Sequence, residues 1–395
     1  MFKGENLKAL RMIEGYSRKS LADVLQVSEQ AVWQYEEQNM MPEINKIYTL
    51  AQKFNVKTKF FFSPNQELFS ITAVDTHSIA FRSKNQRTST KILIQNHAQA
   101  NFYAQLTSHL SAYVKQPHLP ILTLVSKIDR YFSQNIDARV RIQLIANDAR
   151  EMILGDQSNH QLLLALEKFG VYIYEKDLTD DADAYSFWSK YQVPFIILSN
   201  NKGVAVRRHF DLAHELGHLL LHRQIEFDML SHEDFQRIEK EADIFAAEFL
   251  LPEKQFIASF NQVKKKSNPD HFVMLKERWY VSIQAMAMRA YYLGLISDTQ
   301  YRYFWSLINK KGYKKREPLD AEIKLPKPVK INSLLNMLFT KKVLTPESLL
   351  NNLQVEPEFL YKKANISQKL FEKFMQQEKQ TAEADVLKGY IIPFT

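Results

Sequence analysis

The sequence predicts an α+β fold that is mostly helical. Two short runs, residues 170–174 and 194–198, are rich in the β-branched and aromatic residues that favour strands. The segments around them carry apolar residues at helical spacing, interrupted by turn signals. Because 395 residues exceed what one hydrophobic core usually serves, we expect two or three domains. An all-α domain comes first, followed by an α+β core and a helical C-terminal region.

Composition narrows the chemistry of any metal site. The chain has no cysteine, so disulfides and thiolate ligands are excluded and a metal would be held by histidines and carboxylates. No stretch approaches the roughly 20 apolar residues of a membrane span, and the N-terminus lacks the apolar run of a signal peptide. We therefore expect a cytoplasmic protein without membrane contact. The net charge of +8 permits contact with nucleic acid or acidic partners, although solubility is its usual reason.

Turn signals and composition divide the chain into five segments. Residues 1–65 form a run of short helical patterns, and residues 66–119 are predicted to be a linker followed by a bridging helix. Residues 120–262 contain both strand candidates and form the α+β core. We expect residues 263–325 to be a helical subdomain and residues 326–395 to be a small helical unit.

Capping residues mark the helices of the C-terminal third. Ser282 and Ser297 are predicted N-caps, and Gln300 completes a capping box with Ser297. Gly294 closes the first of these two helices. The Thr345-Pro-Glu sequence opens another helix in the last segment. The region after the core is therefore predicted to be helical.

Three apolar helical faces in the first segment predict a small all-α domain. The second and third are separated by a short turn, which is the spacing of a helix-turn-helix. Pro42 closes the turn after the third helix. Asn39 stands close to where a glycine usually ends that helix, and asparagine tolerates the left-handed conformation needed there. The three faces consist of Leu7, Leu10 and Ile13; Leu21, Ala22 and Leu25; and Val32 with Tyr35.

Over residues 5–60 this domain resembles the Xre-type domains of phage repressors, chiefly through residues 17–28 (SRKSLADVLQVS). The resemblance implies that Glu29, Gln30 and Gln34 read the bases of double-stranded DNA, and glutamine can pair bidentately with adenine. Residues 1–60 hold nine Lys or Arg against seven Asp or Glu, so the electrostatic signal for DNA is faint. A protein-binding or dimerising role, including a homodimer, is the rival hypothesis. The candidates for gripping phosphate are Arg11, Arg18 and Lys19.

Residues 209–222 are predicted to form a buried helix, because apolar or small side chains cover most of its circumference. Its polar residues fall in one wedge, and such a wedge on a buried helix needs a common partner. His214 and His218 lie one turn apart, so both rings can reach one ion, and Glu215 flanks them as a general base. Bound Zn²⁺ would activate water for attack on a peptide carbonyl. The pattern therefore predicts a zinc-dependent peptidase.

A second amphipathic helix, residues 238–251, offers the third ligand. Glu239 lies about 60° from the centre of its apolar stripe, whereas Glu241 and Glu248 lie about 100° or more away. This geometry favours Glu239 as the ligand. Asp243 follows Glu239 by one turn and would accept the free N–H of a ligand histidine. Two histidines and one glutamate leave a coordination position open for water.

Three further residues are candidates for contacts with the transition state or the substrate: Tyr185, Arg208 and His222. Arg208 precedes the motif, where positive charge opposes the helix dipole, and it would contact either substrate or a buried carboxylate. His222 extends the face of the two ligand histidines, where a surface or supporting role fits it better than ligation. His232 is an alternative transition-state donor.

The whole arrangement resembles the ImmA/IrrE family of metallopeptidases fused behind an Xre-type helix-turn-helix. The resemblance covers residues 5 to about 325 and implies a gluzincin-like zinc peptidase core with Glu239 as the glutamate ligand. Members of the family cleave a partner repressor, which relieves repression. The matching segments are residues 79–82 (IAFR), 183–188 (DAYSFW), 207–218 (RRHFDLAHELGH), 239–243 (EKEAD), 245–252 (FAAEFLLP) and 279–284 (WYVSIQ).

Two functions from different classes follow. The first is a regulatory endopeptidase that cleaves a specific protein, by the resemblance a DNA-binding repressor, with its own helix-turn-helix supplying localisation. The second is a DNA-binding transcriptional regulator or antitoxin-like protein whose metal site is sensory or structural. Glu215 favours the first, because a structural site needs no general base and usually closes with four protein ligands. Cleavage of its own linker, at about residues 83–90, is a third hypothesis.

Overall fold

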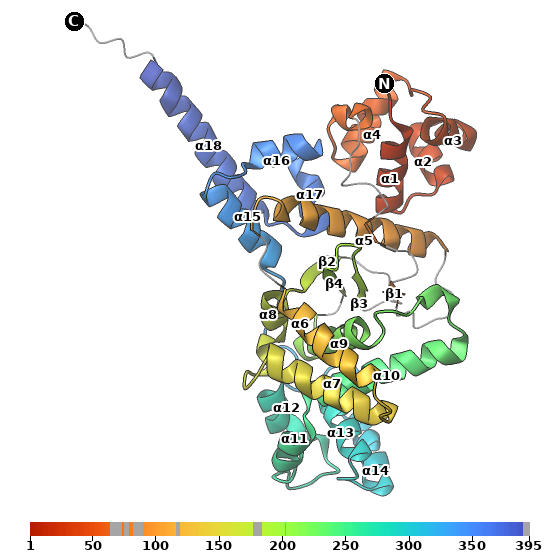
Figure 1. The fold of residues 1–395 in the computed structure, drawn as a ribbon, viewed down its shortest axis with the longest axis vertical. Coiled ribbons are helices and arrows are strands. Elements are labelled where there is room, and N and C mark those ends of the chain that lie inside the picture. Colours follow the sequence, from red (N-terminus) through yellow and green to blue (C-terminus); the bar gives the residue numbers. More distant parts are fainter. Residues whose placement is uncertain are drawn as a thin grey trace, which may run out of the picture. The chain divides into compact units, whose positions relative to one another are not determined.

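The computed structural model describes residues 1–63, 73–74, 79–81, 90–115, 119–176, 184–201 and 203–389. The chain forms two compact units. Unit 1 comprises Met1–Val74, Gln86–Gln116 and Val329–Thr395, and unit 2 comprises Asp75–Asn85 and Pro117–Pro328. Helices dominate both and one small sheet lies in unit 2, so the predicted α+β, mostly helical fold is confirmed (Figure 1). Within the described residues, no helix combines the length and the apolar character required to span a membrane.

The N-terminal part of unit 1 has the helical spacing that the sequence predicts. Only three residues separate its second and third helices, and the hydroxyls of Ser17 and Ser28 cap them by accepting hydrogen bonds from the backbone N–H groups of Ser20 and Ala31. Gln26 ends the second helix in the left-handed conformation, with φ of 54°. The elements are α1 (Gly4–Glu14), α2 (Arg18–Leu25), α3 (Glu29–Glu37), α4 (Ile44–Phe54) and η1 (Thr58–Phe62).

Asn39 adopts the left-handed conformation predicted for it, with φ of 54°. Its side-chain oxygen accepts a hydrogen bond of 2.8 Å from the backbone N–H of Gly4, so the turn after α3 also holds the start of α1. A Cβ added at Gly4 would lie 2.1 Å from the carbonyl oxygen of Tyr35. Only glycine fits this close approach of α1 to α3.

The last segment of the chain packs in the same compact unit as the first domain. Val56 and Val355 form a β-bridge, flanked by backbone hydrogen bonds of 2.9 Å from Lys57 N to Gln354 O and from Glu356 N to Asn55 O. The sequence analysis expected residues 326–395 to form a small unit of their own. In the structure, Val329–Thr395 instead belongs to the same compact unit as Met1–Val74. The remaining elements of unit 1 are α5 (Thr90–Ser111), α15 (Lys330–Thr340), α16 (Pro346–Leu353), α17 (Pro357–Ala364) and α18 (Gln368–Gly389).

Unit 2 contains a four-stranded sheet in the order β1-β3-β4-β2. Both predicted strands are present, as β2 (Tyr172–Lys176) and β4 (Pro194–Ser199), and they pair in parallel. The sequence analysis missed β1 (Ala80–Phe81) and β3 (Ala184–Trp188), which add antiparallel pairs. Four of the five residues of β3 are buried in succession, so this strand lacks the alternation that marks a strand in a sequence.

Helix α9 (Ala205–Leu221) lies between the sheet and α10 (His232–Leu250), and α7 (Ala138–Ile153) packs against α10 (Figure 1). Contacts with β3, β4, α8 and α10 account for the nearly complete burial of α9. The helix between two layers is therefore the one that carries the polar wedge. The elements around it are α6 (Pro120–Phe132), η4 (Asn159–Gln161), α8 (Leu162–Phe169) and η5 (Phe227–Met229).

A group of short helices completes unit 2 after α10. Ser282 caps α13 by accepting from Ala285 N, and Ser297 with Gln300 forms the predicted capping box of α14. Gly294, with φ of 68°, lies just beyond the end of α13, as predicted. The elements are α11 (Glu253–Phe260), η6 (Pro269–Phe272), α12 (Val273–Trp279), α13 (Ile283–Tyr292) and α14 (Asp298–Lys310).

Candidate metal centre

Strand β3 fixes the position of α9 along its axis. The hydroxyl of Ser186 donates a hydrogen bond of 3.2 Å to the carbonyl oxygen of Glu215. The indole N–H of Trp188 donates one of 3.0 Å to the carbonyl oxygen of Leu219. The two donors are two residues apart on one face of the strand, and the two acceptors are one turn apart on the helix. Sequence reasoning missed this anchor, because it depends on a strand that it did not predict.

Gly217 lets α10 approach α9 closely. A Cβ built at this position would lie 3.1 Å from Cδ1 of Phe245 and 3.3 Å from Cα of Ala242. These distances are tighter than ordinary van der Waals contact, so a larger residue would push the two helices apart. The crossing lies next to His218 on α9 and between Glu239 and Phe245 on α10. The close approach therefore brings the acidic side chains of α10 to the histidines of α9.

Three side chains from this crossing converge on one point. His214, His218 and Glu239 each offer a ligand atom, and these atoms all lie within 4.8 Å of one another. The Nε2 atoms of the two histidines are 3.1 Å apart. Carboxylate oxygens of Glu239 lie 3.1 Å from Nε2 of His218 and 3.6 Å from Nε2 of His214. Ligands at 2.0–2.1 Å around a tetrahedral zinc ion are about 3.3 Å apart, so the spacing fits that ion.

Both histidines are held from behind through their other ring nitrogen. Nδ1 of His214 lies 2.9 Å from Oδ1 of Asp243, the partner that the sequence predicts. Nδ1 of His218 lies 3.0 Å from Nδ1 of His222, and Nε2 of His222 lies 3.1 Å from Oε2 of Glu241. For His222 the sequence analysis favoured a surface or supporting role, but it missed the partner, because Glu241 was considered only as a ligand.

The two supporting contacts determine where the ring protons lie. A carboxylate accepts only, so His214 donates through Nδ1–H to Asp243, and His222 donates through Nε2–H to Glu241. Nδ1 of His222 then accepts from Nδ1–H of His218. Both ligand histidines consequently turn an Nε2 lone pair toward the carboxylate of Glu239. Three acceptors directed at one buried point repel one another unless a cation joins them, so the donor set fits a metal ion.

The acidic residues of the site are held in their charged form. Burial raises the pKa of Glu239, but positive charge at the site, which His214 and His218 supply when they are protonated, outweighs burial and leaves that pKa far below its usual range. The contact with His222 lowers the pKa of Glu241. For His222 itself burial dominates and lowers the pKa, against the opposing effect of Glu241. When the imidazoles are neutral, a divalent cation would supply the positive charge that keeps Glu239 anionic.

Glu215 lies inside the same helix, directly after His214, and its residue is 1% exposed. Its position along the helix is fixed by the bond from Ser186 to its own carbonyl oxygen. The residue expected to act as the general base is thus buried on the helix that carries both histidines, and this helix is held by β3 and packs against α10.

The other two candidates for transition-state or substrate contacts lie in packed surroundings. Arg208 is 2% exposed and forms an ion pair with Glu175 of β2, while its guanidinium also donates to Pro326 O at 2.8 Å and Ser199 O at 3.2 Å. The structure thus gives Arg208 the buried carboxylate offered as its alternative partner. Tyr185 is fully buried on β3, with its ring stacked beside Phe187.

The residues proposed to contact DNA differ in their exposure and in their ion pairs. The side chain of Arg18 pairs with Glu36 at 2.8 Å and with Glu37 at 2.5 Å, and Arg11 pairs with Glu36 as well. Glu29 and Gln30 are exposed at the start of α3, and Gln34 is half-buried one turn later. The presumed base-reading side chains therefore lie on one helix, whereas two of the presumed phosphate-gripping arginines are engaged in ion pairs.

Some predicted features lie outside the described residues. These are Arg82 and Asp183, which belong to segments that carry the resemblance, and residues 83–89 of the linker considered for self-cleavage.

Comparison with known proteins bears on the centre of unit 2. Residues 166–291 match the family model of the Peptidase M78 family, described as the IrrE N-terminal-like domain. The matched segment contains β2, β3, β4, α9 and α10, and therefore all the converging ligands. A search of curated proteins found no match. The match supports a metallopeptidase of the ImmA/IrrE type and implies a protein substrate; it does not extend to α1–α4.

Proposed function

We propose that the protein is a zinc-dependent endopeptidase that cleaves a specific protein. The observation that carries the proposal is the convergence of His214, His218 and Glu239, with Glu215 on the same buried helix. The cluster lies inside the segment that matches a peptidase family. A site of three protein ligands with a neighbouring carboxylate suits catalysis, because a structural zinc site usually takes four protein ligands.

The residues divide the chemistry between them. Zn²⁺ bound here would supply a Lewis acid toward water and toward the carbonyl of a peptide bond. Glu215 accepts a proton from the attacking water and returns it to the leaving amine. Asp243 and the pair of His222 with Glu241 hold the ligand rings in one tautomer and one orientation. Ser186 and Trp188 hold the helix on which the ligands and the base lie.

The proposed substrate is a DNA-binding repressor, and the N-terminal domain is the proposed targeting module. Glu29, Gln30 and Gln34 remain its candidate base readers. If α3 reads bases, replacing Gln30 and Gln34 by alanine changes which DNA sequence is preferred while the affinity for unrelated DNA is kept. If the two substitutions change neither, the module serves a protein partner or a homodimer.

The decisive experiment compares host cells that express the wild-type chain with cells that express Glu215→Gln. We expect both proteins to retain zinc, because Glu215 is not among the converging ligands, and only the wild type to create new protein N-termini. Mass spectrometry of N-termini identifies the cleaved protein and the bond, and metal analysis of the purified proteins provides the control. Identical N-termini in both cultures, with zinc retained, would instead favour a DNA-binding regulator whose metal site is sensory or structural.

A further inference from the structure

The positive charge of the chain is concentrated in one part of unit 2. Residues 263–328 contain fourteen Lys or Arg and six Asp or Glu, an excess of eight that equals the net charge of the whole chain. Residues 1–60, which contain the domain proposed to bind DNA, have an excess of only two. Any long-range attraction for a polyanion therefore originates mainly from the helices that follow α10.

Four of the six acidic side chains in residues 263–328 have hydrogen-bond or ion-pair partners within this part or are buried in it, whereas Glu277 and Glu322 are exposed. Glu317 and Asp320 are buried and bind Nζ of the fully buried Lys276 at 2.8 and 2.5 Å. Asp270 binds Nζ of Lys311 at 2.9 Å and accepts from the hydroxyl of Tyr313 at 3.0 Å. Several cations, by contrast, are exposed to solvent: Lys264, Lys265, Lys310, Lys314, Lys315 and Arg316.

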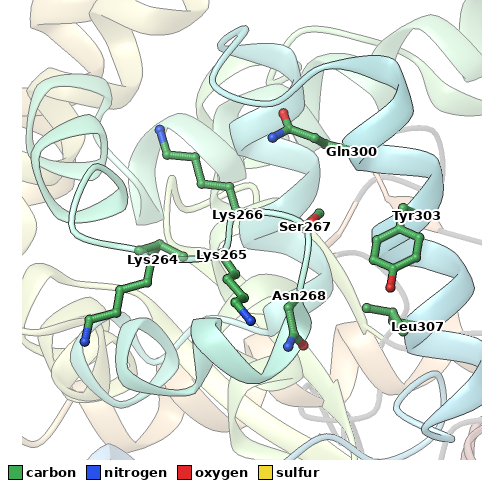
Figure 2. Close-up of a pocket in the computed structure, with 9 residues that line it drawn as sticks. Lys264, Lys265, Lys266, Ser267, Asn268, Gln300, Tyr303 and Leu307 are labelled. Carbon is green, nitrogen blue, oxygen red and sulfur yellow. The ribbon is translucent and has the colours of Figure 1, made fainter.

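Two of these exposed cations, Lys264 and Lys265, border a hollow together with Lys266. The loop of residues 264–268 faces one side of α14, and the two line an open hollow of about 430 Å³. Figure 2 shows the three lysines spreading from this loop, with Tyr303 and Gln300 on the helix opposite. The wall offers amide groups from Asn268 and Gln300, and Tyr303 is 56% exposed. The hollow therefore combines positive charge, neutral donors and an accessible aromatic ring.

Contacts join this loop to the second cluster of cations. Asp270, two residues beyond the loop, binds Lys311 and Tyr313 just after the end of α14. The guanidinium of Arg207 donates to the carbonyl oxygen of Lys315 at 2.9 Å, which holds residues 314–316 beside the start of α9. Residues 264–268 and 310–316 are therefore linked, and we call the exposed cations of these two segments the lysine face.

We propose that the lysine face binds the phosphodiester backbone of a nucleic acid without reading its sequence. A nucleic acid carries regularly spaced charges, and each phosphate that a lysine neutralises releases counterions. Lysines act as point charges that fit such a backbone in many positions, and an exposed tyrosine ring beside them offers a stacking surface to an unpaired base. In the first domain, by contrast, Lys8, Arg11 and Arg18 are ion-paired with Glu36 and Glu37, and residues 1–60 have an excess of only two positive charges.

The test measures binding of the full-length protein to a labelled 30-nucleotide DNA, as duplex and as single strand, over a series of salt concentrations. One variant combines Lys264→Gln, Lys265→Gln and Lys266→Gln. Its matched control combines Lys19→Gln, Lys53→Gln and Lys59→Gln, three exposed lysines of the first domain. A second variant, Lys314→Gln with Lys315→Gln, tests the other half of the face. Zinc content and circular dichroism verify that each protein folds.

We expect each lysine-face variant to lose about tenfold or more in affinity, with a reduced slope of log K against log salt, by up to about 2 to 3 for the triple variant. The control keeps the slope of the wild type. Whichever of the duplex and the single strand binds with higher affinity is the form of nucleic acid that the lysine face prefers. Wild-type affinity in both lysine-face variants, an equal loss in the control, or equally good competition by polyglutamate, which would indicate an acidic protein partner, would each overturn the proposal.

Discussion

The crossing of α9 with α10 and the contact between α1, α2 and α3 both bury charged side chains, but they balance them differently. Around Glu36, whose side chain is fully buried, Arg11 and Arg18 supply donors, and the cluster satisfies itself. Around Glu239, both histidines turn acceptors inward because their N–H groups face Asp243 and His222. The first cluster is a structural ion pair, whereas the second has the donor set of a metal site. The convergence of three possible ligand atoms, more than burial, distinguishes the second cluster from the structural ion pair.

The largest effect should come from removing an acceptor at the crossing. Glu239→Ala should weaken zinc binding by more than about a hundredfold, since even residues that support ligands contribute tenfold to a hundredfold. The measurement is zinc affinity by competition with a chromogenic chelator. Glu233→Ala, an exposed glutamate in the first turn of α10, is the matched control and should bind zinc like the wild type. Loss of zinc in Glu241→Ala with retention in Glu239→Ala would reverse the assignment of the third ligand.

In the ion-pair cluster of the first domain, Glu36→Gln should lower the free energy of unfolding without changing the affinity for zinc. It leaves Arg11 and Arg18 without their buried carboxylate, at a cost of about 2 kcal/mol in the free energy of unfolding. Urea unfolding followed by circular dichroism measures this, and Glu29→Gln, exposed on α3, is the control. A change in zinc affinity with no change in stability would mean that the two regions are not independent.

The two sets of contacts behind the ligand histidines, His222 with Glu241 and Asp243 alone, should each contribute a smaller, separable amount to zinc affinity. Glu241→Gln and His222→Gln should each weaken zinc binding by about tenfold, and their double variant should lose no more than either alone, because both act through His218. Asp243→Asn acts through His214, so its effect should add to that of Glu241→Gln. Additive losses within the first pair would show that His222 and Glu241 do not act as one chain.

The smallest predicted effect is on the pH dependence of stability, and it concerns His209, a histidine of α9 that is buried but is not among the converging ligands. His209 is fully buried, with Nδ1 3.0 Å from Tyr280 O, and burial lowers its pKa to about 4. The unfolded chain therefore takes up a proton near pH 6.5 while the folded protein does not, so stability falls as pH falls from 6.5 toward 4. Between pH 6.5 and 5.5 the loss should be about 1 kcal/mol. His209→Gln should remove this part of the pH dependence, whereas His271→Gln, at a half-buried histidine, should keep it.

The sequence could predict those features that depend on residues close to one another along the chain. The spacing of His214 and His218 and the helical position of Glu239 are local properties, and the structure brings these residues together. Asn39 was predicted correctly for the same reason, since its conformation depends on the end of one helix. The fold class followed from periodicity along single segments.

What the sequence could not predict depends on how distant segments pack. Arg18 and Glu36 are eighteen residues apart, and only the crossing of α2 with α3 makes them partners, so the sequence could not predict this ion pair. Strand β3 and its hydrogen bonds to α9 could not be predicted, because they depend on the pairing of β3 with β4 and on the packing of the sheet against α9. Glu241 becomes a partner of His222 only once α9 and α10 are adjacent.

The most direct test of a zinc ion held by His214, His218 and Glu239 is X-ray absorption spectroscopy of the zinc-loaded, full-length protein. We predict one zinc per chain with two imidazole nitrogens at about 2.0–2.1 Å and oxygen ligands at about 2.0–2.2 Å, one of them lost in Glu239→Ala. A first shell without imidazole scattering, or one that keeps two imidazoles and the same oxygens in Glu239→Ala, would contradict this account.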